Sequence, residues 1–242
     1  MTYERELRDR VFVALDVPTA GEARRLVERL EGEATSFKIG LQLFCSAGPE
    51  LVRELASSGY RIFLDLKFHD IPNTVAGAVR SVAGLGVAMI NVHCAGGAQM
   101  LRAAREALTE GEEGEEGERP ALLGVTVLTS LDDDDLRALG VAHTSEGQVL
   151  VMARTAKEAG LDGVVCSPRE IGLLRADLGE NFLLVTPGIR PAWSAAGDQK
   201  RITTPAQALA DGASALVIGR PITAHADPAE AMRRVLEELA PI

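Results

Sequence analysis

The part of the sequence with the clearest chemical potential is an apolar run that ends in alternating charges. The run Tyr60–Leu66 contains Asp65, and Lys67 and Asp70 follow it. Residues two apart on a β-strand project from the same face, so we expect Asp65 and Lys67 to point the same way. Lys38 lies on the preceding predicted strand and can join them. Together these side chains form an alternating set of ammonium and carboxylate groups, which are the groups that proton-transfer chemistry uses.

Alternating charges of this kind have two interpretations. Each opposite charge at a few ångströms offsets the cost of removing its neighbour from water, so every member of the set stays ionised. Ionised groups held in a fixed array can act on a bound substrate. The same array also occurs as a structural salt-bridge network at the rim of a barrel. The pattern alone leaves both interpretations open.

The elements that must position these residues are short apolar strands. Near-continuous apolar runs, rather than alternating ones, are typical of parallel strands that are covered on both faces. The sequence predicts such strands at Val11–Leu15, Phe37–Ile39, Tyr60–Leu66, Val87–Val92, Ala121–Val127, Gly163–Cys166, Phe182–Thr186 and Ala215–Ile218.

Segments with helical spacing lie between the strands. They are Ala20–Leu30, Glu50–Ser57, Thr74–Ala83, Gln99–Leu108, Gly147–Ala159, Pro168–Arg175, Pro205–Ala210 and Pro228–Leu239. Thr19, Ser167, Thr204 and Asp227 each precede a proline or an acidic first turn, as capping residues do. Regular alternation of strand and helix over this length predicts an α/β protein, a single (β/α)8 TIM barrel formed as one domain by residues 1–242.

In such a barrel the functional residues lie where the strands end, at their carboxyl ends. Polar residues at these points are Asp16, Lys38, Asp65, Lys67, Asp70, His93, Thr129, Ser130, Arg190, Gly219 and Arg220. For His93, a hydrogen-bonded residue behind the site is favoured over a direct catalyst. His69 differs from Lys67 in strand parity and is given no role. Trp193 lies after the seventh strand, where it can report loop closure or simply pack.

Composition narrows the class of protein. Hydrophobic residues make up 46% of the 242 residues and charged residues 25%, a globular rather than a disordered composition. The net charge of −10 offers no broad basic surface for nucleic acid. The N-terminus alternates charges, and no apolar run is long enough to span a bilayer. We expect a cytoplasmic protein with no nucleic-acid or membrane partner.

Three other features are assigned structural roles. The widely spaced Cys45, Cys94 and Cys166 predict buried thiols rather than a disulfide scaffold or a zinc site. The acidic, glycine-rich stretch Gly111–Glu118 predicts a solvated loop. The run Asp132–Asp135 predicts the start of a solvated helix rather than a metal cluster, because adjacent carboxylates point in different directions.

A set of motifs resembles the orotidine 5′-phosphate decarboxylase family over nearly the whole chain. Residues 65–74, DLKFHDIPNT, resemble the family's Asp-x-Lys-x-x-Asp signature. The remaining motifs match in order and spacing: Asp16 in VALD, Lys38 in FKIG, Thr129 in VLTS, residues 186–191 as TPGIRP, 197–199 as GDQ, and 217–222 as VIGRPI. As a set these motifs are highly specific.

The resemblance implies roles for individual residues. Lys38, Asp65 and Lys67 of one subunit form the catalytic network, and Asp70 reaches in from the partner of an obligate homodimer. The remaining implied substrate contacts are Ile71 and Thr74 in the partner's site, Asp16 at the ribose hydroxyls, Thr129 near the pyrimidine, and Gln199, Gly219 and Arg220 at the phosphate, with Arg190 nearby. The loop 187–201, which contains Gln199, is expected to close over the ligand.

The implied reaction converts orotidine 5′-monophosphate to uridine 5′-monophosphate and CO₂, the last step of de novo pyrimidine nucleotide synthesis. Loss of CO₂ leaves a carbanion at C6 that the ring cannot delocalise well. A fixed ammonium can stabilise it and then protonate it, and Lys67 is predicted to do both. No metal and no cofactor are expected.

Two alternatives remain. One is a related barrel that decarboxylates a sugar phosphate through a magnesium-stabilised enediolate, such as 3-keto-L-gulonate 6-phosphate decarboxylase. That family has an acidic residue on the second strand, where this sequence has Lys38, and an ammonium repels a divalent cation. The other is an inactive nucleotide-binding protein, although every expected charge is present.

Overall fold

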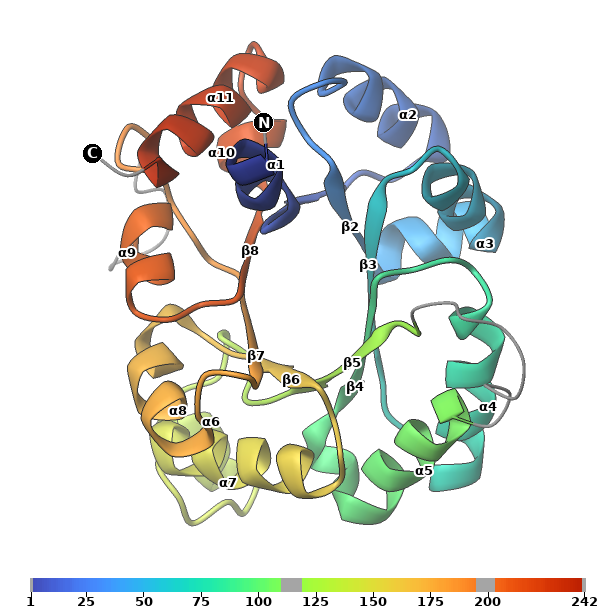
Figure 1. The fold of residues 1–242 in the computed structure, drawn as a ribbon. Coiled ribbons are helices and arrows are strands. Elements are labelled where there is room, and N and C mark those ends of the chain that lie inside the picture. Colours follow the sequence, from blue (N-terminus) through green and yellow to red (C-terminus); the bar gives the residue numbers. More distant parts are fainter. Residues whose placement is uncertain (1, 110–118, 195–202, 241–242) are drawn as a thin grey trace.

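Eight parallel strands close into a barrel in chain order, β1 to β8 (Figure 1). The structure is a computed structural model and describes residues 2–109, 119–194 and 203–240. The strands are β1 (Val11–Ala14), β2 (Ser36–Gly40), β3 (Arg61–Phe68), β4 (Met89–His93), β5 (Ala121–Val125), β6 (Gly163–Val165), β7 (Leu183–Thr186) and β8 (Ala215–Ile218). The predicted α/β barrel is therefore confirmed.

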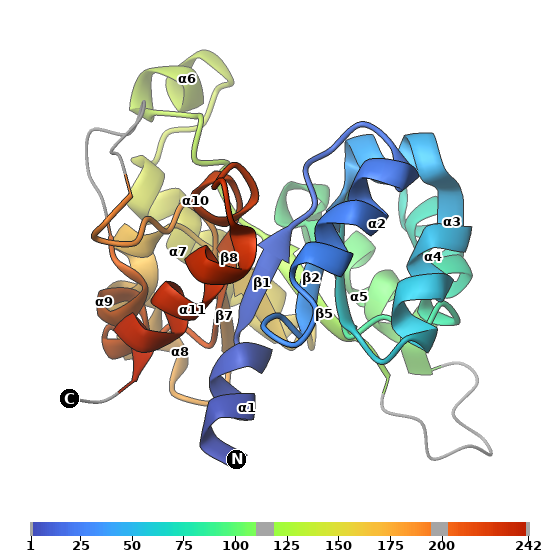
Figure 2. The same cartoon turned by 90° about the horizontal axis from the view of Figure 1, so that it is seen from above.

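Helices surround the strands on the outside of the barrel (Figure 1). They are α1 (Thr2–Asp9), α2 (Ala20–Arg29), α3 (Leu41–Ser57), α4 (Pro72–Ala83), α5 (Gly97–Thr109), α6 (Asp133–Ala138), α7 (Ser145–Glu158), α8 (Ile171–Leu178), α9 (Pro205–Ala210), α10 (Arg220–Thr223) and α11 (Pro228–Leu239), with 3₁₀ turns η1 (Cys94–Gly96) and η2 (Pro168–Glu170). Helix α1 lies at one end of the barrel, and α6 and α10 lie at the end where the strands finish (Figure 2).

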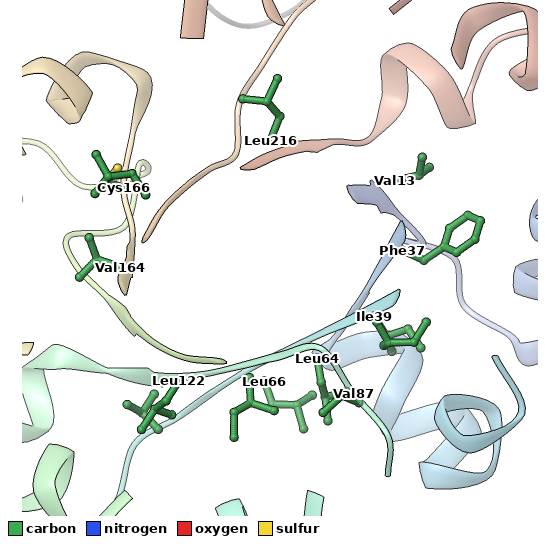
Figure 3. Close-up of a cluster of buried hydrophobic side chains, with 14 of the residues drawn as sticks. Val13, Phe37, Ile39, Leu64, Leu66, Val87, Leu122, Val164, Cys166 and Leu216 are labelled. Carbon is green, nitrogen blue, oxygen red and sulfur yellow. The ribbon is translucent and has the colours of Figure 1, made fainter. Parts of the chain in front are cut away.

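Alternation along each strand divides the apolar residues into two cores. Side chains that point outward, such as Phe37, Leu64 and Leu122, pack beneath the helices (Figure 3). Side chains that point inward, such as Phe12 and Phe63, fill the barrel. Burial of a large apolar side chain stabilises a fold by about 1.5–3 kcal/mol, so these two layers hold the strand ends in place.

The predicted helix starts are confirmed at the level of single hydrogen bonds. The Thr19 hydroxyl accepts from the Glu22 amide at 3.2 Å, and Thr204 caps α9 in the same way. Asp227 caps α11, and at the η2 turn the Ser167 amide donates to the Glu170 carboxylate at 2.8 Å. Each cap satisfies an amide that has no partner within the first helical turn, which fixes where the helix begins.

Some boundaries differ from those that the sequence predicts. Helix α1 precedes the barrel where no helix is expected. Helix α3 begins at Leu41 rather than Glu50 and is kinked at Gly48, where φ is 70°. The left-handed conformation at Gly48 lets the chain bend and start again at Pro49, a favoured first residue of a helix.

The predictions for the three cysteines and for the acidic run at Asp132 have different outcomes. Cys94 and Cys166 are buried, and burial raises the pKa of each thiol to about 12. The prediction of a buried Cys45 is wrong: it lies exposed on α3, where helical periodicity turns it away from the core. Asp132 caps α6, as predicted for a solvated helix start.

The predicted solvated loop Gly111–Glu118 lies outside the described residues. Within the part of the chain that the structure describes, no helix is both long and apolar enough to cross a membrane.

Candidate active site

A chain of alternating charges lies where β1, β2 and β3 end. The Lys38 ammonium is 2.6 Å from Asp16 Oδ1 and 3.8 Å from Asp65 Oδ2. The Lys67 ammonium is 2.6 Å from the other oxygen of Asp65. The sequence-predicted grouping of Lys38, Asp65 and Lys67 is thus present within one chain, and Asp16 extends it.

Burial changes along this charged chain. Lys38 is 7% exposed and Asp65 is largely buried, whereas Lys67 is partly exposed and Asp16 is mostly exposed. Desolvation disfavours a buried charge, but each of these groups has an opposite charge within a few ångströms to offset that cost. The inner members are therefore held rigidly, and the outer ones can reach a ligand.

A glycine makes room for this array. At Gly40 an added Cβ would lie 3.1 Å from the Lys38 ammonium nitrogen and 3.5 Å from Asp16 Oδ1. The first of these contacts is tight, so a side chain at position 40 displaces the ammonium. The motif FKIG contains this glycine, but only the structure shows why a glycine is required at position 40.

The strand that carries Asp65 and Lys67 is irregular beside them. Strands β3 and β4 are in register at Leu64 and again at Phe68, but between these points three residues of β3 face one residue of β4. Lys67 lies in this bulge with φ of 53°, the one positive φ at a non-glycine residue in the described ranges. Such a conformation costs on the order of 1–3 kcal/mol, so its surroundings must hold it.

Sequence reasoning missed a residue that holds the bulge, Asn91. Its side chain is fully buried within the barrel. Its Nδ2 donates to Asp65 Oδ1 at 2.7 Å, and its Oδ1 accepts from the Lys67 amide at 2.7 Å. The signal in the sequence was a single side-chain amide in the apolar run MINVH. A polar side chain on a buried strand destabilises the fold unless it has hydrogen-bond partners.

His93 lies beyond Asn91 at the end of β4. Burial lowers the pKa of His93, and the nearby His69 and the positive charge of Lys67 lower it further. The two imidazole rings have centroids 5.4 Å apart, and His93 Nδ1 is buried without a hydrogen-bond partner among the described residues. The expectation that His93 is hydrogen-bonded is therefore wrong for Nδ1.

Asp70, Ile71 and Thr74 do not join the charged chain of their own subunit. Asp70 is exposed, and its Oδ1 accepts from the adjacent Ile71 amide at 2.6 Å. It forms no salt bridge with the residues described. Ile71 is 66% exposed, and Thr74 is exposed in the first turn of α4. Among the described residues, none of the three forms a hydrogen bond or ion pair with Lys38 or Lys67 of its own chain.

The loops after β5, β6 and β7 surround a cavity of about 980 Å³. The cavity lies at the same end of the barrel as the charged side chains. Thr129, Ser167 and Pro187 are among its lining residues. Arg190, after β7, is buried, and its Nε has no partner in the described parts of the chain. A buried guanidinium without an anion is costly, so this residue is suited to an anionic ligand.

The remaining predicted residues follow β8 and β7. Gly219 follows β8 as the N-cap of α10, and a Cβ there would make only ordinary contacts, the nearest at 3.5 Å from Ala14. Packing within the chain thus does not demand a glycine. Arg220 begins α10 at the same end of the barrel. Gln199 and residues 195–201 of the predicted closing loop lie outside the described residues.

Trp193 packs rather than projecting freely. Its ring lies 4.3 Å beneath the Arg234 guanidinium of α11 and meets His225 edge-on at 5.9 Å. These contacts attach the segment after β7 to the last helix. The packing interpretation of this tryptophan is confirmed.

Comparison with known proteins identifies the family of this chain. A family model for orotidine 5′-phosphate decarboxylase / HUMPS proteins matches residues 9–235. The orotidine 5′-phosphate decarboxylase of Alkalilimnicola ehrlichii is 54% identical over 231 residues, covering 96% of each protein. That of Moorella thermoacetica is 53% identical over 233 residues, covering 96% of this chain and 92% of the relative.

A solved structure agrees with these sequence matches. The crystal structure of orotidine 5′-phosphate decarboxylase from Lactobacillus acidophilus superimposes with a TM-score of 0.85 at 41% identity, covering 95% of this chain and 98% of that one. The similarity extends over the barrel and over the strand ends that carry the charged side chains. The chain therefore belongs to the orotidine 5′-phosphate decarboxylase / HUMPS family.

Proposed function

We propose that this protein, as a single-domain enzyme, decarboxylates orotidine 5′-monophosphate to uridine 5′-monophosphate without a metal or cofactor. The observation that carries the proposal is the Asp16–Lys38–Asp65–Lys67 array, with contacts of 2.6 Å at both ends. Its relatives at 53–54% identity bear the name of this activity. With a net charge of −10 the protein must hold an anionic nucleotide in a local pocket, and we place the enzyme in the cytoplasm with no nucleic-acid or membrane partner.

Lys67 is the proposed acid. Cleavage of the C6–carboxylate bond releases CO₂ and leaves the electron pair on C6. The ammonium of Lys67 stabilises that pair as it forms and then transfers a proton to C6, leaving a neutral amine that regains its proton from solvent. Its left-handed backbone and its ion pair with Asp65 fix the nitrogen before substrate binds.

The other charges serve this step. Asp65 holds Lys67 and lies against the substrate carboxylate, where repulsion falls as CO₂ leaves. Lys38, buried between Asp16 and Asp65, balances the two carboxylates. The exposed face of Asp16 is free to accept hydrogen bonds from the ribose hydroxyls.

The phosphate is assigned to the loops after β7 and β8. Gly219 has no side chain, so an anion can approach its backbone closely. The packing of the chain itself does not require a glycine there. Arg220 and Arg190 supply charge-assisted donors, and Gln199 adds a further contact. Thr129 borders the adjoining cavity, where the pyrimidine ring is placed. Binding energy gained at the phosphate can align the reacting end of the substrate.

Lys38 also separates this proposal from magnesium-dependent sugar-phosphate chemistry. A divalent cation beside β2 would meet an ammonium where it needs a carboxylate. Lys38 is buried and doubly paired, so it cannot swing away without breaking two ion pairs. The donor set at this position therefore does not suit a metal ion.

The active form is proposed to be a homodimer with shared sites. Asp70 is exposed and unpaired with the described lysines of its own chain. The adjoining Ile71 is 66% exposed, and Leu41, which follows β2, is 60% exposed. Large exposed apolar side chains at the same end of the barrel suit a subunit interface. In the dimer, Asp70, Ile71 and Thr74 complete the partner's site.

A turnover assay tests the proposed reaction. Purified protein is incubated with orotidine 5′-monophosphate and EDTA, and the ultraviolet absorbance change is followed with identification of the product. We expect conversion to uridine 5′-monophosphate at the same rate with and without EDTA. Loss of turnover on chelation would favour the magnesium-dependent sugar-phosphate enzyme. No turnover alongside tight binding of uridine 5′-monophosphate would favour the inactive binding protein.

Subunit mixing tests the shared site. Asp70→Ala and Lys67→Ala homodimers are both expected to be inactive. Exchanged subunits form mixed dimers in which one site has both residues intact, so activity should return to about a quarter of the wild-type value at random exchange. Failure to recover activity, with subunit exchange verified by mass, contradicts an Asp70 contribution from the partner.

A further inference from the structure

Asn91 is a polar side chain in the interior of an otherwise apolar strand. It lies on β4 with its side chain fully buried, between the inward-facing Met89 and His93. An amide in such a place destabilises the fold unless its donor and its acceptor both have partners. What these partners are therefore indicates why the residue is there.

Both partners of Asn91 belong to the charged array. Its Nδ2 donates to Asp65 Oδ1, the same oxygen that receives the Lys67 ammonium. Its Oδ1 accepts from the backbone amide of Lys67. One rigid side chain thus fixes the carboxylate at one end of the Asp65–Lys67 pair and the main chain at the other.

The second contact replaces a missing strand bond. Regular pairing of β3 with β4 stops after Leu64 and resumes at Phe68, and Lys67 adopts a left-handed φ of 53° between them. The Lys67 amide, which a regular ladder would satisfy with a carbonyl, is satisfied by the Asn91 side chain at 2.7 Å. Asn91 therefore supports the backbone conformation that aims the Lys67 side chain at Asp65.

We propose that Asn91 is a positioning residue for the decarboxylation step, an inference that rests on the proposed function. It acts through Asp65 and Lys67 and holds the ammonium at the place where the carbanion forms. Asparagine is suited to this task because it is short and carries both a donor group, its NH2, and an acceptor, its carbonyl oxygen. Serine at this position is too short to span both contacts, and aspartate replaces the donor with a second carboxylate facing Asp65.

Asn91→Ser tests the positioning of Lys67. We expect kcat to fall on the order of 100-fold, because a displacement of about 1 Å at the reacting group is enough for such a loss. KM should change by less than about threefold, because an interaction used only in the transition state is removed. A merely structural role would instead lower the melting temperature and leave kcat per folded molecule unchanged.

Asn91→Asp adds a readout that a structural role does not move. Its carboxyl faces Asp65 and Lys67 on β3, with Lys38 on β2 and His93 on β4 close by. When protonated it can donate to Asp65 as the amide does, and when ionised it repels Asp65. We expect kcat of this variant to rise toward the wild-type value as pH falls, while wild-type kcat shows no such rise.

Ser36→Ala is the matched control. Ser36 is equally buried inside the barrel, but its hydroxyl donates to the Asp9 carbonyl at 3.3 Å, at the opposite end from the charged array. We expect its kcat, KM and pH profile to match those of the wild type. A fall in kcat as large as that of Asn91→Ser would contradict a specific role for Asn91.

A crystal structure of Asn91→Ser supplies a readout without turnover. We expect Lys67 to leave the left-handed region and its ammonium to move out of hydrogen-bond range of Asp65. Unchanged Lys67 geometry overturns the proposal, whatever the activity. If the wild type fails to turn over orotidine 5′-monophosphate, the proposed function fails, and the crystal structure still decides whether Asn91 positions Lys67.

Discussion

The two ends of the barrel both carry buried charge, but they use it differently. At the end where the strands begin, arginines bind main-chain carbonyls and the Asp162 carboxylate. Arg175 alone donates to the carbonyls of Gly179, Glu180, Phe182 and Gly212 and to the Ser214 hydroxyl. Arg10 donates to the carbonyls of residues 213 and 214 in the same region.

The opposite end uses lysines paired with carboxylates. The Lys67 ammonium has Asp65 as its one described partner and remains partly exposed. An arginine whose guanidinium donors are all hydrogen-bonded holds the surrounding backbone in place. An ammonium with one partner retains donors for a ligand. The difference indicates that charge at the first end stabilises the barrel and charge at the second end performs chemistry.

The largest expected effect on stability is at the end where the strands begin. Arg175→Ala removes these hydrogen bonds together, several of them part-buried, so we expect the free energy of unfolding to fall by about 3–5 kcal/mol. The values of kcat and KM measured on folded protein at low temperature should remain within about twofold of the wild type. Denaturant unfolding and steady-state kinetics check both statements.

Arg154→Ala is the control for that variant. Its ion pair with Asp177 is exposed, so we expect its removal to leave the free energy of unfolding nearly unchanged. A loss of activity in Arg175→Ala that exceeds its loss of folded protein would break the proposed division between the two ends.

A smaller effect is expected from acid. Burial raises the pKa of Asp162, but hydrogen bonds from Arg119 and the Leu122 amide, with the charges of Arg119 and Arg105, outweigh burial and hold that pKa below its usual range. The resulting stabilisation is complete above the unfolded-state pKa of about 3.9 and is lost as pH falls through the lower folded-state pKa.

Comparison with Asp162→Asn measures this contribution. The wild type should be more stable than the variant by about 1–3 kcal/mol near neutral pH, and the gap should narrow below about pH 4. Unfolding midpoints measured across that range check the prediction. A gap that is the same at acid and neutral pH would show that the Asp162 charge does not contribute.

Much of the site could be predicted because strand parity and strand ends are written in the sequence. Apolar runs located the strands, and the spacing of Asp65 and Lys67 placed both on one face. The contact between Lys38 and Asp65 follows once the two strands are neighbours, and β2 and β3 are. Motif resemblance supplied the family, which the comparisons confirm.

What could not be predicted depends on tertiary contacts. No local pattern reveals that β3 bulges opposite Asn91 or that Lys67 is left-handed, because both follow from how β3 and β4 pair. The exposure of Cys45 depends on how α3 is turned against the barrel. Helix α1 escaped prediction because it is short and mostly charged, so few apolar residues mark it.

Turnover by Lys67→Ala tests the central claim most directly, namely that the charge at the carboxyl ends of the strands is catalytic. Wild type and variant are purified from a host that lacks its own orotidine 5′-monophosphate decarboxylase and are compared with EDTA present. We expect kcat of the variant to fall by about 10⁴-fold or more, with a melting temperature within a few degrees of the wild type. Turnover by a folded Lys67→Ala variant within about tenfold of the wild type would contradict the account.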